Sequence, residues 1–187
     1  SNPLVHSGID PTPMHAIITN STYDGLCYNV RRVEELLGES VDRLHFDEAW
    51  FGYARFNPMY HERFAMHGEP ASHTPDRPTV FATQSTHKLL AALSQASMIH
   101  IRDGRRPIDH ARFNEAFMMH ASTSPNYAII DSNDVSAAMM EGPGGKALTD
   151  DSIREAVSFR RMLARLNAEF LEKGEWFFSV WQPDTVF

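Results

Sequence analysis

The sequence predicts an α/β fold built on a mostly parallel sheet with one antiparallel strand. Four short apolar segments rich in strand-forming residues recur along the chain, at 16–19, 44–46, 79–83 and 98–101. Between the first two, residues 28–37 carry apolar side chains at helical spacing and end before Gly38, a residue that suits a helix terminus. A strand, a helix and a second strand in this order predict a parallel pair.

The fourth strand is predicted to run antiparallel to the third. Only about a dozen residues separate them, including a short apolar turn of helix, which leaves little room for the crossover that a parallel pair requires. Before the third strand, residues 68–78 contain three prolines among polar residues and predict a long surface loop.

The later part of the chain is predicted to be helical. Ser124 and Pro125 resemble a cap followed by proline at the first helical position, with Gly142 as the end of that helix. Residues 142–146 are glycine-rich but only superficially similar to a phosphate-binding loop, so we interpret them as a flexible connector. Thr149 is predicted to cap a final helix with one apolar face, which ends at Gly174.

Composition limits the class of protein. With 187 residues, 42% of them hydrophobic and 22% charged, the chain is predicted to form a single domain over residues 1–187. A net charge of −7 and no basic cluster longer than a pair argue against nucleic acid or an anionic membrane as a partner. No apolar run is long enough to span a bilayer, and Cys27 is the only cysteine, so we expect a cytoplasmic protein without disulfides.

The segment 83–88, Thr-Gln-Ser-Thr-His-Lys, ends a predicted strand with hydroxyls, an imidazole and a lysine. Ligands of open α/β sheets bind at such strand ends. Lys88 could act as a Schiff-base nucleophile if partial burial and a neighbouring cation promoted loss of its proton. The hydroxyls of Ser85 and Thr86 could meet phosphate oxygens. Taken alone, the segment also fits a solvated lysine at the start of a helix.

Asp47 closes the second predicted strand, in the segment Phe-Asp-Glu-Ala-Trp, at the same edge of the sheet as Lys88. A buried carboxylate needs a partner, and a protonated pyridine nitrogen is one such partner. The alternative interpretation is that Asp47 caps the turn that follows it. The ten histidines predict no metal site, because His61 and His67 lie six positions apart and not the four that place two ligands on one helical face.

Together, a strand-ending aspartate and a later Ser-x-His-Lys segment resemble the fold type I enzymes that use pyridoxal 5′-phosphate (PLP). Residues 46–58, 85–97 and 113–125 resemble the large bacterial ornithine, lysine and arginine decarboxylases. The segment 48–56, Glu-Ala-Trp-Phe-Gly-Tyr-Ala-Arg-Phe, is more similar to the acid-induced biodegradative arginine enzymes than to the lysine enzymes. The resemblance implies the C-terminal, lysine-bearing half of a major PLP-binding domain, with helices on both faces of its sheet.

The resemblance also implies a role for each residue that matches the motifs. Lys88 would be the lysine joined to PLP, Asp47 would pair with its ring nitrogen, and Trp50 would pack close to it. Ser85 and His87 would lie near the phosphate and the reacting centre. Ser122 or Thr123 would reach the phosphate of a neighbouring subunit in a homodimer or larger homo-oligomer.

The implied reaction is decarboxylation of a basic amino acid, arginine to agmatine and carbon dioxide, in acid resistance. Lysine and ornithine are the alternative substrates, and either His87 or Lys88 could donate the proton to the α-carbon. The chains of the family are several-fold longer, so we expect a fragment that is inactive alone. Two other interpretations stay open: a non-catalytic assembly or binding piece, and another fold type I reaction such as transamination or aldol cleavage.

Overall fold

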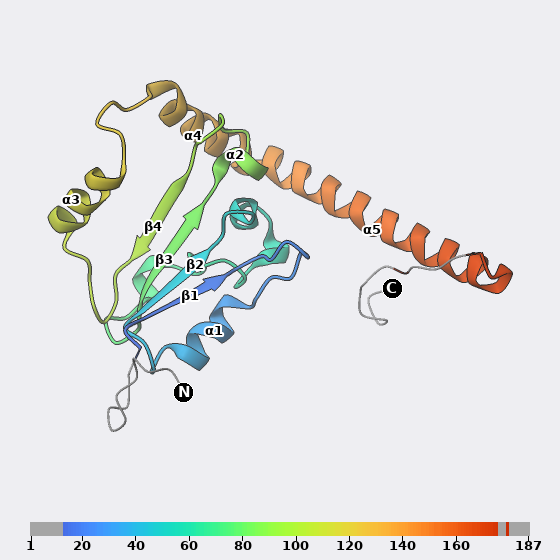
Figure 1. The fold of residues 1–187 in the computed structure, drawn as a ribbon, viewed down its shortest axis with the longest axis horizontal. Coiled ribbons are helices and arrows are strands. Elements are labelled where there is room, and N and C mark those ends of the chain that lie inside the picture. The colour runs from blue at the N-terminus through green and yellow to red at the C-terminus, as the bar shows by residue number, and fades with distance from the viewer. Residues whose placement is uncertain (1–12, 176–178, 180–187) are drawn as a thin grey trace, which may run out of the picture. The chain divides into compact units, whose positions relative to one another are not determined.

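A four-stranded sheet organises the first part of the chain in the computed structural model, which describes residues 13–175 and 179. Its strands lie in the order β1 (His15–Thr19), β2 (Arg43–Asp47), β3 (Thr79–Gln84) and β4 (Met98–Arg102) (Figure 1). The first three are parallel and β4 is antiparallel to β3. This confirms the predicted α/β fold and its mostly parallel sheet with one antiparallel strand.

The connection between β1 and β2 contains the predicted helix, α1 (Val30–Leu37). It begins two residues later than predicted because the Asn29 side chain caps it, accepting a hydrogen bond from the Arg32 amide at 2.9 Å. The helix ends before Gly38, as predicted. The single helical turn between β3 and β4 is α2 (Thr86–Leu89). The predicted loop at 68–78 contains one short 3-10 turn, Pro70–Ser72.

One face of the sheet carries the core of this region. Alternate residues of the two central strands point to the same side as α1, because successive side chains of a strand point to opposite faces. The buried cluster that results consists of Val30, Val41, Leu44, Phe46, Ala65, Val80 and Ala82.

The opposite face carries the intervening side chains, including the adjacent residues Ile17, His45 and Phe81. Ile17 is 68% exposed, whereas Phe81 is buried between the rings of His15 and His45, whose centroids lie 5.9 and 6.0 Å from its own. His45 Nε2 also lies 3.1 Å from Thr83 Oγ1. This face is therefore an aromatic and imidazole surface and is less deeply buried than the core.

Two helices follow β4, α3 (His110–His120) and α4 (Tyr127–Met140). Helix α3 was not predicted from the sequence, and none of its residues is buried. The predicted cap at Ser124 and Pro125 is wrong. Asn126 precedes the helix, and its side chain accepts a hydrogen bond from the Ala128 amide at 3.1 Å.

A second compact unit begins at Glu141, and its long helix is α5 (Gly142–Lys173). The predicted connector at 142–146 is wrong, because these residues already belong to the helix, with Pro143 in its first turn. The prediction that Thr149 caps the helix is also wrong, because its hydroxyl donates to the Gly145 carbonyl oxygen within the helix. The predicted end is confirmed at Gly174, which has a φ of 69°.

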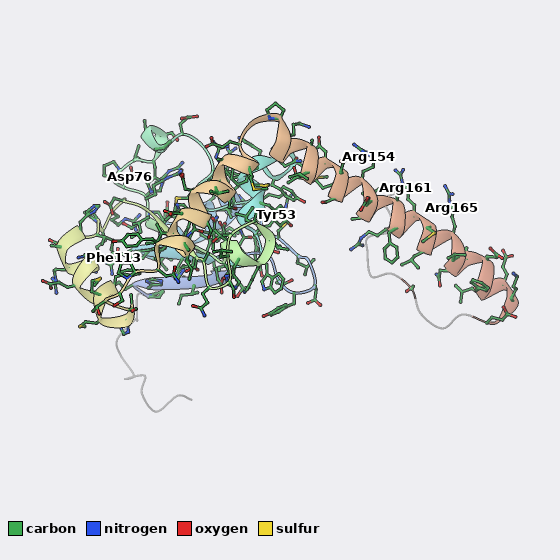
Figure 2. All side chains as sticks on the ribbon, turned by 90° about the horizontal axis from the view of Figure 1, so that it is seen from above. Tyr53, Asp76, Phe113, Arg154, Arg161 and Arg165 are labelled. Atoms are coloured by element: carbon green, nitrogen blue, oxygen red, sulfur yellow. The ribbon has the colours of Figure 1, made fainter. Side chains whose placement is uncertain are left out.

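The side chains of α5 are divided between its sides. Figure 2 shows Arg154, Arg161 and Arg165 projecting from one side, as their spacing of seven and four residues requires. Large apolar side chains elsewhere on the helix are exposed, with Phe159 at 56% and Leu171 at 57%. Within the unit described from Glu141 onward, α5 therefore presents apolar side chains without a core of its own.

Candidate active site

A cavity of about 420 Å³ lies at the carboxyl ends of β1 and β2. The parallel direction of these strands brings their last residues to one edge of the sheet, with Thr19, Asp47 and Thr83 side by side. The cavity is lined by Thr19, Ser21, Thr22, Tyr23, Asp24, Asp47, Ala49, Trp50 and Lys88. The carboxylate of Asp47 and the amine of Lys88 therefore belong to one cavity.

Asp47 is held by the turn that follows it. Its Oδ1 accepts a hydrogen bond from the Ala49 amide at 3.0 Å, which fixes the direction of the carboxylate. The backbone continues the parallel ladder just beyond the strand ends, with the Asn20 amide donating to the Asp47 carbonyl oxygen at 2.8 Å. The turn-capping interpretation and the cavity-lining interpretation of Asp47 thus hold together.

Lys88 reaches the cavity from α2. Its Nζ lies 4.8 Å from the centre of the Trp50 ring, a distance at which a cation is attracted to the face of an indole. The Trp50 ring in turn packs edge-on against Tyr23, with centroids 5.7 Å apart. Lys88 is exposed, which differs from the partial burial considered in the sequence analysis, because its short helix projects the side chain over Trp50 and not into the core.

His87 and Ser85 flank the cavity without lining it. His87 Nδ1 lies 2.7 Å from the carbonyl oxygen of Ala96, which can only accept, so Nδ1 carries the hydrogen and donates it. Ser85 is the residue before α2, and its carbonyl oxygen accepts a hydrogen bond from the Lys88 amide at 3.0 Å. Both residues therefore hold the local conformation of the segment that carries Lys88.

Ser122 and Thr123 are not brought to this cavity within the chain. They lie in the exposed connection between α3 and α4. Ser122 Oγ accepts a hydrogen bond from the Ser124 amide at 3.1 Å, which makes a local turn. The predicted role of these two residues at a neighbouring subunit stays a prediction.

Helix α4 fixes α2 and the chain that follows it through three short polar side chains. The Thr86 hydroxyl donates to Asn133 Oδ1 at 2.5 Å. Ser136 Oγ accepts from the Ala91 amide at 3.1 Å, and Ser132 Oγ accepts from the Leu93 amide at 3.0 Å. Because both Thr86 and Ser136 are buried, these contacts anchor the segment that carries Lys88.

Behind Asp47, on the core side, lies a fully buried carboxylate, that of Glu48. Its Oε1 accepts hydrogen bonds from Asn20 Nδ2 at 2.9 Å and the Ala65 amide at 2.6 Å, and its Oε2 accepts from Gln84 Nε2 at 3.2 Å. Burial raises the pKa of Glu48, and the three hydrogen bonds act in the opposite direction because they favour the ionised form.

Sequence reasoning did not find the cavity wall formed by residues 21–24. This loop directly follows β1, so the rule that led to Asp47 and Lys88 would have found it if applied to the first strand as well. Asn20 holds the far end of the loop, because its Oδ1 accepts a hydrogen bond from the Tyr28 amide at 3.2 Å. Asp24 adds a second carboxylate to the cavity.

Neither a cluster of metal ligands nor a membrane-spanning helix occurs in the described part of the chain. No group of three or more His, Cys, Asp or Glu side chains that could hold a metal ion occurs in residues 13–175. Among the helices of this same range, none is long and apolar enough to cross a membrane.

The fold and this strand-end cavity define an α/β domain with a lysine and an aspartate at one ligand-binding edge. Residues 4–187 match the family model described as Orn/Lys/Arg decarboxylase, major domain, and the chain belongs to this family. It is 55% identical over 185 residues to the biodegradative arginine decarboxylase of Escherichia coli K12. That alignment covers 99% of this chain and 24% of the relative, so the chain spans about a quarter of that relative's length.

Lysine decarboxylases are similar to almost the same degree. Lysine decarboxylase LdcA of Pseudomonas aeruginosa is 54% identical over 187 residues, covering 100% of this chain and 24% of the relative. The solved structure of lysine decarboxylase A from P. aeruginosa superposes with a TM-score of 0.84, covering 97% of this chain and 24% of that one. The structure of E. coli constitutive lysine decarboxylase gives a TM-score of 0.77 at 47% identity, over 93% and 23% of the two chains.

Proposed function

We propose that this chain contributes the lysine-bearing half of the active site of a PLP-dependent decarboxylase that acts on a basic amino acid. The observation that carries the proposal is that Asp47 and Lys88 line one cavity in a chain of this family. An amine and a carboxylate at the same strand-end edge are the two groups that an aldehyde-bearing pyridine ring requires of a protein.

The residues of the cavity fit this cofactor. Lys88 would supply the amine that joins the cofactor aldehyde, and the directed carboxylate of Asp47 would hold the ring nitrogen. Trp50 would supply an aromatic wall beside the cofactor, while Ser85 and His87 are proposed to lie near the phosphate and the reacting centre. When bound, PLP supplies an electron-withdrawing ring that accepts the electrons of the bond to the departing carboxylate.

The chain offers two groups that can move a proton in this reaction. Lys88 lines the cavity, where its Nζ could give or take a proton at the reacting carbon. His87 is fixed next to it by the hydrogen bond to Ala96. We propose Lys88 as the proton donor to the α-carbon, because it reaches the cavity whereas His87 only flanks it.

Arginine is the proposed substrate, with agmatine and carbon dioxide as the products. The support is the likeness of residues 48–56 to the arginine enzymes and the 55% identity to an arginine decarboxylase. Lysine is the second candidate, favoured by the 54% identity to a lysine decarboxylase. Assays of the complete polypeptide with arginine, lysine and ornithine, with the amine product identified, distinguish the candidates.

The whole enzyme is proposed to be a homodimer or larger homo-oligomer, in which Ser122 or Thr123 reaches the cofactor phosphate of a neighbouring subunit. Support comes from the exposure of both residues, which leaves them accessible to a partner. Because the chain spans about a quarter of its relatives, we propose that it depends on the remaining domains for activity. A non-catalytic assembly piece is the contrasting possibility.

Borohydride trapping tests the site. The sequence contains three lysines, Lys88, Lys146 and Lys173, so reduction in the presence of PLP followed by peptide mass spectrometry shows which of them is modified. We expect Lys88 to be labelled selectively, with Lys88→Ala losing the label and Lys146→Ala keeping it. Equal labelling of all three lysines in both the chain and the complete polypeptide would contradict the proposal. Labelling of Lys88 in the complete polypeptide alone would show that this chain depends on its remaining domains.

A further inference from the structure

Glu48 is the most completely buried charged side chain near the cavity, yet it does not line it. It has no exposed surface, whereas its neighbour Asp47 lines the cavity. The two carboxylates point to opposite sides because consecutive residues of an extended segment alternate. A buried carboxylate is costly unless hydrogen bonds compensate for its lost hydration, and Glu48 accepts three of them. The burial of this carboxylate next to a cavity-lining residue therefore indicates a structural role for Glu48.

The donors to Glu48 come from three separate segments of the chain. Asn20 directly follows β1 and precedes the cavity wall at 21–24. Gln84 is the last residue of β3, one position before Ser85 and the lysine-bearing turn. Ala65 belongs to the chain that follows Trp50 and packs in the core. One carboxylate therefore joins the segments that carry the wall, the lysine and the core beneath them.

The backbone hydrogen bonds between β2 and β3 continue as far as Glu48. The Glu48 amide donates to the Thr83 carbonyl oxygen at 2.8 Å, which is the last ladder hydrogen bond between the second and third strands. Beyond it, the side chain of Glu48 is what continues the connection to Gln84. Without this acceptor, the buried amide of Asn20 would lose one partner and Gln84 would lose its hydrogen bond across the strand ends.

We infer that Glu48 is a positioning residue of the active site, whose carboxylate holds the ends of β1, β2 and β3 so that Asp47 and Lys88 share one cavity. The inference rests on the proposed function. Glu48 acts through its neighbours and touches neither substrate nor cofactor. Its removal is therefore expected to lower the rate of the chemical step more than the binding of substrate.

The test compares variants at the two ends of the same strands, in the complete polypeptide. Glu48→Leu keeps a side chain of similar size but accepts no hydrogen bond. Glu48→Gln keeps one oxygen that can accept from Asn20 and Ala65. Thr79→Val is the matched control, because Thr79 is fully buried and its hydroxyl makes two hydrogen bonds at the opposite end of β3. Unfolding midpoint, kcat, KM and borohydride labelling of Lys88 are measured for each.

For Glu48→Leu we expect kcat to fall about 10- to 100-fold with little change in KM, because a misplacement of about 1 Å can cost roughly 100-fold in rate. Glu48→Gln is expected to recover most of this loss, and Thr79→Val to lower the unfolding midpoint without changing kcat. An unchanged kcat in Glu48→Leu, or an equal loss of kcat in Thr79→Val, would overturn the inference.

Two further results separate the possible failures. If Glu48→Leu does not fold, Gln84→Met decides, since it removes the link across the strand ends from a partly buried position and must itself lower kcat. If the wild-type complete polypeptide never labels at Lys88, the proposed function is overturned and this inference with it. A labelled wild type with an unchanged Glu48→Leu overturns only the role of Glu48.

Discussion

Buried polar groups form different kinds of hydrogen bond at the two ends of the sheet. At the amino end of β3, the Thr79 hydroxyl donates to the Arg106 carbonyl oxygen and accepts from the Gly104 amide, so main-chain groups close the edge. At the carboxyl end, buried polar side chains such as Glu48 bond to one another and leave a cavity in front of them. The same sheet is therefore closed by hydrogen bonds to main-chain groups at one end and borders a cavity at the other.

Replacing an aspartate by asparagine at each end of β2 is the most sensitive test of this contrast. Asp47→Asn is expected to lower kcat of the complete polypeptide about 10²- to 10³-fold, because the proposed partner of the ring nitrogen loses its preorganised charge. Asp42→Asn removes a partly exposed carboxylate that pairs with Arg106 at 3.0 Å, and ion pairs near the surface contribute little. Its kcat is expected to match wild type, and equal losses in both variants would break the comparison.

Gly104→Ala tests the sealed end. A methyl group at Gly104 would lie 2.6 Å from the Pro78 carbonyl oxygen and would also collide with that of Arg77, both of them rigid backbone atoms. We expect a loss of about 2–3 kcal/mol in the free energy of unfolding, measured by urea denaturation, as overpacked sites show. Labelling of Lys88 by PLP in the folded fraction should not change. A variant as stable as wild type would show that this end tolerates movement.

The serines of α4 test how the open end is supported. Ser136→Ala removes the acceptor of the Ala91 amide and Ser132→Ala removes that of the Leu93 amide. Each lost hydrogen bond is expected to cost about 1 kcal/mol, and therefore to speed exchange of the matching amide about fivefold. Hydrogen exchange should show the effect at residue 91 in the first variant and at residue 93 in the second. Acceleration at both amides in either variant would contradict separate anchors.

The histidines between the two ends predict a smaller, pH-dependent effect. Burial lowers the pKa of His15 and His45, and a neighbouring charge, Arg43 for His15 and His15 for His45, lowers each further. As the pH falls below their ordinary value of 6.5, the unfolded chain takes up protons before the folded chain does, so the free energy of unfolding decreases. The decrease stops once the pH is below the folded-state pKa values.

Urea denaturation between about pH 8 and pH 5 measures this effect, in a window that lies above the ordinary range of most carboxylates. His45→Gln keeps a polar group for Thr83 and removes the titration of the ring. Its unfolding free energy is expected to fall less steeply than that of wild type below pH 6.5. Parallel curves for the two proteins would contradict the assignment.

The sheet and the placement of Asp47 and Lys88 at one cavity could be predicted, because strand periodicity is visible in the local sequence and parallel strands bring their carboxyl ends to one edge. The last helix was predicted to begin at Thr149 because a threonine before two aspartates looks like a cap. In the folded chain, the helix begins at Gly142 instead, with Pro143 in its first turn, and it includes Gly144 and Gly145. A local cap signal was outweighed by a helix that begins earlier.

Glu48 could not have been singled out by sequence, although it lies within the segment that identified Asp47. A glutamate after a strand has no local pattern that distinguishes a solvated side chain from a buried one. Its burial depends on Asn20, Ala65 and Gln84, which are separated from it by 28, 17 and 36 positions. Only the convergence of these distant segments makes it an acceptor of three hydrogen bonds.

The hydrogen bond between His87 and the Ala96 carbonyl oxygen limits where the imidazole ring can exchange a proton. Because Nδ1 is committed to that oxygen, the neutral ring can exchange hydrogen with its surroundings at Nε2 alone. Any hydrogen that His87 passes on must enter and leave through this nitrogen. A group that exchanges a proton with this ring must therefore reach Nε2.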